Sequence, residues 1–366
     1  MKKAMERAAG VMSVVLVAVA VSCVAMRLPQ QAGQFAAVTA AGFILPNGAA
    51  DGFFSEEAPD SSPQTKRPAA SSAPSSAPAS SGTVTVYPGT PGSSSGQPES
   101  SSSTAADSEP SSSMLPGKIL EMCIDSGGSQ YGNVWVKNSN KHHAVDIGQE
   151  LQKQPAVKIK KNAGPQVLIY HTHTTEAFQG VTRSTDKSLS VCAVGDEIAK
   201  QLSNAGIGVV HDTTYHDYPA YNGSYDRSCT TVTNDLKKYP SIQVTLDIHR
   251  DAMSRDDGTR LKPTAVVNGK KAAQIMIVAG CDDTGDLGFP DWEYNFRLAV
   301  RAQKSLCDLY PNLARPIDFC PDRYNENLTR GSLLVEFGTD ASTLDEVKYS
   351  GELFGKALAA ALDGLT

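Results

Sequence analysis

The second half of the chain alternates between two patterns of hydrophobic and polar positions. Short, wholly apolar runs are typical of strands covered on both faces, whereas apolar residues that recur every three or four positions predict amphipathic helices. Strands that alternate with helices predict an α/β fold, with a mostly parallel sheet flanked by helices. The pattern predicts strands at residues 167–170, 207–210, 242–248, 273–279 and 332–335, and helices at 194–205, 292–309 and 343–362.

The last of these helices has a recognisable start. Thr343 and Glu346 stand in the Thr-x-x-Glu pattern of a capping box, in which two side chains bind backbone N–H groups that the first helical turn leaves unpaired. The helix is therefore expected to begin directly after Thr343.

The first residues have the pattern of a membrane segment. The apolar run 8–26 contains no charge, and at about 1.5 Å per helical residue it spans the hydrocarbon core of a bilayer. Lys2, Lys3 and Arg7 precede it and place the N-terminus in the cytoplasm. Residues 1–28 are therefore predicted to be a single-pass transmembrane anchor in the cell membrane. A cleaved signal peptide is the alternative, because small residues follow at 36–42, and it also exports the rest of the chain.

The composition then changes twice before the region of alternating strands and helices. Ser, Pro, Ala and Gly dominate from about residue 55, which predicts a disordered linker over residues 29–113. Such a linker reaches on the order of 40 to 50 Å by random-coil scaling. Residues 114–160 contain strand-like pieces at 118–124 and 133–136 and are interpreted as a small N-terminal extension. Residues 161–366 remain as the catalytic domain.

Charge and cysteine content exclude some classes of function. The net charge of -6 gives no basic footprint, so nucleic acid is not expected as a partner. The seven cysteines lie far apart without a CxxC pair, which argues against a thiolate zinc cluster or a dense disulfide framework. Most of them are expected to be small buried residues, although one or two disulfides remain open for an exported chain.

Polar side chains end three of the predicted strands, where ligands gather in α/β sheets. His173 follows the first of these strands, and His249 ends a second one. Two imidazoles and one carboxylate are a common ligand set for a catalytic Zn²⁺ that keeps one position open. The sequence therefore predicts a zinc site with His173, His249 and a carboxylate that follows the first strand. Glu176 and Asp186 are both candidates for that carboxylate.

Two further carboxylates have predicted roles beside this site. Asp247 has the same strand parity as His249 and is expected to orient its ring. Glu336 ends the third strand and is the candidate general base, which takes a proton from water.

Other interpretations account for less of the sequence. A serine or cysteine nucleophile is disfavoured, because the chain has no GxSxG elbow and no cysteine beside a strand-end histidine. A non-catalytic anchored scaffold or wall-binding protein explains the anchor and linker, but not the polar groups that end three apolar strands. The remaining histidines lie in polar loops and are expected to be exposed: His142, His143, His211 and His216.

Several long segments around these residues resemble the stage II sporulation protein P family of endospore-forming bacteria. The resemblance runs from about residue 168 to the C-terminus, and the anchor and the Ser/Pro-rich linker match as well. The segments occur in order, which makes the resemblance specific. They are 168–176 (LIYHTHTTE), 216–225 (HDYPAYNGSY), 247–252 (DIHRDA) and 334–338 (LVEFG).

This family is distantly similar to zinc N-acetylmuramoyl-L-alanine amidases, so the resemblance implies an amidase-like fold and site. The first ligand histidine of the amidases falls on His173 or, with a two-residue shift, on His171. Their second ligand histidine matches His249 and their catalytic glutamate matches Glu336. Their glutamate ligand has no unambiguous equivalent here, so both carboxylate candidates stay open.

The resemblance implies cleavage of the lactyl-amide bond between muramic acid and L-alanine in peptidoglycan, and it allows a second activity on peptide cross-links. Arg250 is then the residue expected to position the substrate or to stabilise the oxyanion. The implied partners are stage II sporulation proteins D and M, in the remodelling of septal wall during engulfment. The implied location of the catalytic domain is the septal space outside the cytoplasm.

Overall fold

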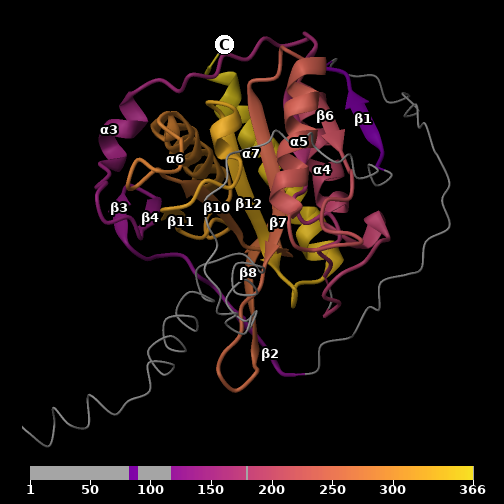
Figure 1. The fold of residues 1–366 in the computed structure, drawn as a ribbon. Coiled ribbons are helices and arrows are strands. Elements are labelled where there is room, and N and C mark those ends of the chain that lie inside the picture. Colours follow the sequence, from indigo (N-terminus) through magenta and orange to yellow (C-terminus); the bar gives the residue numbers. More distant parts are fainter. Residues whose placement is uncertain (1–81, 90–116, 179, 366) are drawn as a thin grey trace, which may run out of the picture. The chain divides into compact units, whose positions relative to one another are not determined.

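The computed structural model describes residues 82–89, 117–178 and 180–365, and its centre is a sheet of nine strands. The strands of this sheet lie in the order β1, β6, β5, β7, β12, β10, β11, β4 and β3 (Figure 1). Their bounds are β1 Val84–Tyr87, β3 Ser129–Tyr131, β4 Val134–Asn138, β5 Pro165–Tyr170, β6 Gly208–Asp212, β7 Val244–Asp251, β10 Ile275–Gly280, β11 Ile317–Cys320 and β12 Ser332–Thr339.

The strand directions make this a mixed sheet. Strands β6, β5, β7 and β12 run parallel to one another, and β10, β11 and β4 form a second parallel group. The two groups meet antiparallel at β10 and β12, and the edge strands β1 and β3 are also antiparallel to their neighbours. The predicted α/β class is confirmed, whereas the sheet is parallel only within each group. A smaller sheet joins β2 (Ile119–Met122), β8 (Arg260–Val267) and β9 (Lys270–Ala273).

Helices cover both faces of the main sheet. Helices α4 (Val191–Asn204), α6 (Trp292–Leu309) and α7 (Leu344–Asp363) share one large apolar core with the sheet. Helix α5 (Ser224–Lys238) packs on the opposite face, over β5 and β6, and lies in front of the sheet in Figure 1. Shorter helices are α3 (Ile147–Gln152), η2 (Lys187–Leu189) and η3 (Glu326–Leu328).

Side-chain alternation along β7 decides which residues face the site. Val244, Leu246 and Ile248 belong to the large core. Because successive side chains of a strand point to opposite faces, Asp247 and His249 point to the face that carries α5. The polar residues at this end of β7 are therefore on the opposite side of the sheet from α4, α6 and α7.

The helix signals in the sequence agree with the structure at two positions and miss the short helix α3 and the longer helix α5. Helix α6 has the predicted bounds, and the capping box of Thr343 and Glu346 is present at the start of α7. Helix α5 was not predicted, because most of its residues are polar. It buries Val232 as its one large apolar side chain, so the periodic signal is weak.

The two N-terminal predictions fall largely outside the described residues. The predicted anchor, residues 1–28, lies wholly outside them, and no helix within the described ranges has the length and apolar character needed to cross a bilayer. The predicted disordered linker, residues 29–113, is wrong for residues 82–89. Val84, Thr85 and Val86 are β-branched and Tyr87 is aromatic, which favours a strand, and this segment pairs with the edge strand β6 as β1.

Residues 114–160 do not stand apart as an extension. Strand β4 pairs with β11 and widens the main sheet, β3 follows it, and β2 pairs with β8. Strands β2 and β4 overlap with the pieces predicted at 118–124 and 133–136. The cysteines that the structure describes are free thiols, and Cys192, Cys281 and Cys320 among them are buried.

Candidate metal centre and catalytic residues

The ends of three parallel strands meet at one edge of the sheet and bring the predicted site residues together. Strand β7 lies between β5 and β12 and is parallel to both. His173 lies in the turn that follows β5, His249 is in β7, and Glu336 is in β12. Glu336 and His249 are direct register partners, so their side chains leave the sheet on the same face.

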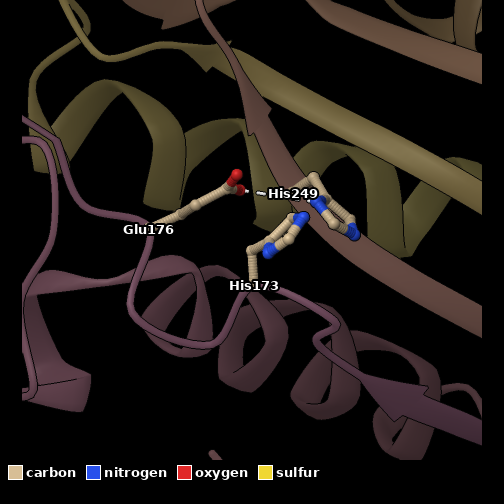
Figure 2. A group of neighbouring side chains, drawn as sticks. All are labelled: His173, Glu176 and His249. Atoms are coloured by element: carbon tan, nitrogen blue, oxygen red, sulfur yellow. Dashed lines mark ion pairs between the residues drawn. The ribbon is translucent and has the colours of Figure 1, made fainter. Parts of the chain in front are cut away.

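His173, Glu176 and His249 form a compact buried group. Each of them offers one ligand atom, and these atoms lie within 4.8 Å of one another. Figure 2 shows that His173 and Glu176 come from the same loop and face His249 on its strand. The nearest Glu176 oxygen, Oε2, lies 3.5 Å from Nδ1 of His249 and accepts a hydrogen bond from the backbone N–H of Arg250 at 3.0 Å. The loop and the strand are therefore connected at the group itself.

The donor set and its unsatisfied atoms fit a zinc ion. Both ring nitrogens of His249 are buried without a hydrogen bond of good geometry, a costly state for an imidazole in a protein interior. Burial lowers the pKa of His249, but the carboxylates of Asp247 and Glu176 raise it well above its ordinary value. Two imidazoles and one carboxylate, all close together, are the ligand types of catalytic zinc sites. The described residues thus fit Zn²⁺ at this place.

The carboxylate of Asp247 is held against the His249 ring. Its Oδ1 lies 2.9 Å from Nε2 of His249. Thr172 donates to Asp247 from its backbone N–H at 2.8 Å and from its hydroxyl at 2.6 Å. Asp247 is fully buried and cannot move without losing these bonds. The structure therefore places Asp247 where an orienting residue for His249 has to lie.

Glu336 has the environment of a carboxyl that can hold a proton. It is buried, and its Oε2 has no hydrogen-bond partner. Burial, followed by the negative charge of Asp251, raises the pKa of Glu336 well above its ordinary range. Its neighbour in the register is His249. A carboxyl with this raised pKa beside the metal group is suited to exchange protons with a reacting molecule.

The structure leaves His171 outside the metal group. Its Nδ1 lies 3.0 Å from the carbonyl oxygen of Ile248, and its Nε2 lies 2.9 Å from Nε2 of His211. Nδ1 of His211 in turn lies 2.9 Å from Oδ1 of Asp196, and the same Asp196 oxygen accepts a hydrogen bond from the Tyr87 hydroxyl at 3.1 Å. Burial, with His211 second, lowers the pKa of His171 to about 3. Of the two alternatives from the resemblance, His173 is the histidine that lies with Glu176 and His249.

Asp186 also lies outside the group. It is at the surface before the short helix η2, where its Oδ1 accepts from the backbone N–H of Ser188 at 2.9 Å and from the Ser188 hydroxyl at 2.6 Å. The side chain acts as a helix cap. Of the two candidate carboxylates, Glu176 is the one that lies with His173 and His249.

The structure does not support a substrate contact for Arg250. The side chain is 1% exposed. Its guanidinium donates to the carbonyl oxygens of Ala177 at 2.8 Å and Thr182 at 2.7 Å, and more weakly to that of Asp251 at 3.4 Å. Arg250 thus fixes the loop that carries Glu176 to β7, through these side-chain bonds and through its backbone N–H, which donates to Glu176.

A loop that sequence reasoning left out forms the wall beside His173. The ring of Tyr221 stacks on His173 with centroids 4.7 Å apart, and the ring of Tyr225 meets it edge-on at 5.6 Å. His216 and Asp217 hold the loop, through the carbonyl oxygen of His171 at 2.7 Å and the hydroxyl of Thr175 at 2.7 Å. In the sequence, only the family resemblance, which includes residues 216–225, indicated that this loop belongs to the site.

Two of the four histidines that were expected to be exposed are in fact buried. His211 and His216 lie in the interior. Both were interpreted as surface residues because polar residues surround them in the sequence, but His211 is on strand β6 and both rings have specific partners. His142 is exposed and His143 partly so, close to the prediction.

Comparisons with known proteins agree with the resemblance noted in the sequence. The chain is 29% identical over 218 residues to the stage II sporulation protein P of Bacillus subtilis, a match that takes in 54% of this chain and 51% of that protein. The chain thus spans about half the length of the curated relative that it matches.

Solved structures with a similar arrangement include two amidases. The N-acetylmuramoyl-L-alanine amidase AmiC2 of Nostoc punctiforme is 14% identical, with 55% of this chain and 96% of that one covered and a TM-score of 0.33. The CwlD amidase from Clostridioides difficile, in complex with the GerS lipoprotein, is 12% identical, with 55% and 98% covered and a TM-score of 0.34.

The family assignment comes from a family model. The model of the stage II sporulation protein P family matches residues 118–359. This range contains the whole metal group and Glu336, and it is more than half of the 366 residues. The chain therefore belongs to the stage II sporulation protein P family.

Proposed function

We propose that the protein is a zinc-dependent peptidoglycan hydrolase, an N-acetylmuramoyl-L-alanine amidase that acts in wall remodelling during sporulation. The observation that carries the proposal is the buried group of His173, Glu176 and His249 with Glu336 as its register neighbour. Family membership supports a sporulation role. The ligand types support hydrolysis, because two imidazoles and one carboxylate leave a position open for water or substrate.

The roles of the residues follow from their positions. When bound by the three side chains, Zn²⁺ supplies Lewis-acid chemistry that polarises a carbonyl and makes water more acidic. Glu336 takes the proton of the attacking water and returns it to the leaving amine, so that one C–O bond forms as the amide C–N bond breaks. Asp247 keeps the His249 ring in place, and Tyr221 stacks on the His173 ring. Hydrolysis of a peptide cross-link breaks the same type of bond and uses the same groups.

The cellular setting is part of the proposal. Residues 1–28 anchor the chain in the cell membrane as a single pass, and the catalytic domain acts outside the cytoplasm, in the septal space. The sequence pattern supports this, with a charge-free apolar run after Lys2, Lys3 and Arg7. Stage II sporulation proteins D and M are the proposed partners, and peptidoglycan is the proposed substrate.

Replacement of Glu336 by Gln tests the chemical step. Glu336→Gln keeps the shape of the side chain but removes its ability to exchange a proton, so turnover of purified peptidoglycan is expected to fall by about 100-fold or more. The zinc content is expected to equal that of the unmodified protein. Asp186→Asn is the matched control, because this exposed carboxylate caps a short helix and its loss should leave turnover unchanged. Full turnover of the Glu336→Gln variant would assign the proton transfer to another residue.

The scaffold interpretation has its own test. A chain with His249→Ala is expected to lose hydrolysis and to fail to support wall remodelling in cells. Normal remodelling by that inactive chain would favour a non-catalytic role.

A further inference from the structure

Tyr225 lies in the first turn of α5, and its ring contacts the metal group. The ring meets that of His173 edge-on, with centroids 5.6 Å apart. It also contacts the ring of Tyr324, at 5.8 Å, in the loop that follows β11. Tyr225 is only partly buried, so a ligand can reach it from solvent. The ring therefore belongs to the wall beside His173 that is open to a substrate.

The hydroxyl of Tyr225 faces the carboxylates around the metal group. Burial raises its pKa well above the ordinary value, and the negative charges of Asp247, Glu336 and Glu176 raise the pKa further. Because an electrostatic effect of this kind falls off with distance, the phenol oxygen lies close to these carboxylates. They come from β7, from β12 and from the loop after β5. A phenol is protonated at neutral pH and can donate a hydrogen bond at the place where these elements meet.

This hydroxyl is not used by the fold. Within the described residues, the side chains that hydrogen-bond Tyr225 use its carbonyl oxygen, which accepts from Nδ2 of Asn325 at 2.9 Å and from the Ser228 hydroxyl at 3.1 Å. The hydroxyl of a tyrosine in a protein interior usually has a partner, because an unpaired donor is costly there. The phenol donor is therefore available to a bound molecule.

The backbone of the neighbouring loop holds Tyr225 in place. Tyr324 and Asn325 have φ angles of 44° and 62°, in the left-handed region that costs free energy for residues other than Gly. This conformation brings the Tyr324 ring against Tyr225 and the Asn325 amide to its carbonyl. A donor that is fixed before the substrate arrives needs no reorganisation during the reaction, which is the property of groups that stabilise charge in a transition state.

We propose that Tyr225 is a further catalytic residue, whose hydroxyl donates a hydrogen bond to the oxygen of the scissile carbonyl as that oxygen becomes negative. Attack by water forms the new C–O bond and moves the carbonyl electron pair onto this oxygen. The pair returns when the C–N bond breaks, and Tyr225 keeps its proton throughout. Arg250, the residue expected for this role, donates to loop carbonyls instead. The inference rests on the proposed function for the identity of the reaction.

The substitution Tyr225→Phe removes the hydroxyl and keeps the ring that contacts His173 and Tyr324. The zinc content should equal that of the unmodified protein, because the phenol is not among the ligand atoms. With soluble peptidoglycan fragments as substrate, kcat should fall by about 100-fold, the usual loss for one oxyanion donor, and KM should change by less than about threefold. Tyr239→Phe is the matched control, because Tyr239 is a partly buried tyrosine at the opposite end of α5. Its kcat should be unchanged.

Binding of a tetrahedral analogue gives a readout that does not depend on turnover. The probe is an N-acetylmuramyl peptide in which a phosphinate replaces the scissile amide, so that one phosphinate oxygen stands for the oxyanion. Calorimetry on the zinc-loaded full chain should give a Kd about tenfold or more higher for Tyr225→Phe than for the unmodified protein. The peptide with its amide intact, measured with Glu336→Gln present in both chains to stop turnover, should bind them with Kd values within about threefold, because its carbonyl oxygen is not yet negative.

The outcomes separate this inference from the proposed function. A full kcat of Tyr225→Phe, or an equal Kd for the phosphinate, overturns the inference and leaves the proposed function standing. A higher KM with an unchanged kcat also overturns it, because Tyr225 would then bind only the ground state. Loss of zinc from Tyr225→Phe would make the residue structural. Absence of hydrolysis by the unmodified, zinc-loaded chain refutes the proposed function, and this inference with it.

Discussion

Arg250 offers a direct test of the difference between a structural and a catalytic role. The substitution Arg250→Met keeps the length of the aliphatic stem and removes all guanidinium donors. The structure predicts that the loop from Ala177 to Thr182 then loses its main connection to β7, because Arg250 donates to both of these carbonyls. Glu176 lies at the start of this loop, and its position in the metal group depends on the same connection.

The expected loss of stability can be worked out from the hydrogen bonds that the substitution removes. The donations at 2.8 and 2.7 Å are strong charge-assisted hydrogen bonds, whereas the third, at 3.4 Å, contributes little. Hydrogen bonds to charged groups contribute about 1.5–3 kcal/mol each. The buried carbonyl of Ala177 loses its guanidinium donor, whereas the partly buried carbonyl of Thr182 keeps only a weak donation from the Ala177 N–H at 3.4 Å. The free energy of unfolding should therefore fall by about 3–5 kcal/mol. For a domain of this size the midpoint of thermal unfolding should fall by about 10 °C.

Urea denaturation followed by circular dichroism measures this change, with zinc content determined on the same samples. Arg330→Met is the matched control, because Arg330 is exposed and its ion pair with Asp291 lies at the surface. Its stability should change by less than about 1 kcal/mol. Unchanged stability of Arg250→Met together with a lost turnover would contradict the reasoning and restore Arg250 as a substrate-binding residue.

Two other predictions concern the ligand set and the pH dependence of stability. His173→Ala and Glu176→Gln should each lower the zinc affinity by about tenfold or more, whereas Asp186→Asn should leave it unchanged, as measured by competition with a zinc-binding dye. Burial, followed by the negative charge of Asp212, raises the pKa of Asp235 to about 7. Because an unfolded aspartate titrates near pH 4, the folded state loses stability as the pH rises from about 4 to about 7. Asp235→Asn should therefore stabilise the protein by about 1 kcal/mol or more at pH 8 and not at pH 4, and equal thermal midpoints of the two proteins at pH 8 would contradict this.

The sequence is sufficient to predict the strand ends that build the site. Parallel strands end at the same edge of a sheet, so His173, His249 and Glu336 are expected close together from the strand pattern alone. Strand parity also places Asp247 beside His249, and the structure has them 2.9 Å apart. The positions of these side chains can be predicted because each depends on the period of two along a strand and on the order of strands in the chain, whereas their roles stay predictions.

Loops and polar helices could not be predicted in the same way. His171 and His173 differ by one strand period, and only the hydrogen bonds of His171 to His211 and Ile248 separate their roles. Glu176 and Asp186 both follow β5, and the turn that brings one of them back to the metal group is set by the tertiary contacts of Arg250. Long-range contacts of this kind leave no periodic signal in the sequence.

The same limit applies to the edges of the sheet. Strand β1 consists of β-branched and aromatic residues inside a long Ser/Pro-rich region, and its pairing with β6 is what makes it a strand. Sequence composition averages over such a short segment. Strands β3 and β4 likewise become part of the main sheet only through the pairing of β4 with β11.

The measurement that tests the central claim most directly is the appearance of new L-alanine amino termini in purified peptidoglycan. The account predicts that the zinc-loaded protein generates them, that a chelator stops their formation, and that added Zn²⁺ restores it. An equal rate in the presence of the chelator, or new reducing sugar ends in place of amino termini, would contradict a zinc amidase built on His173, Glu176 and His249.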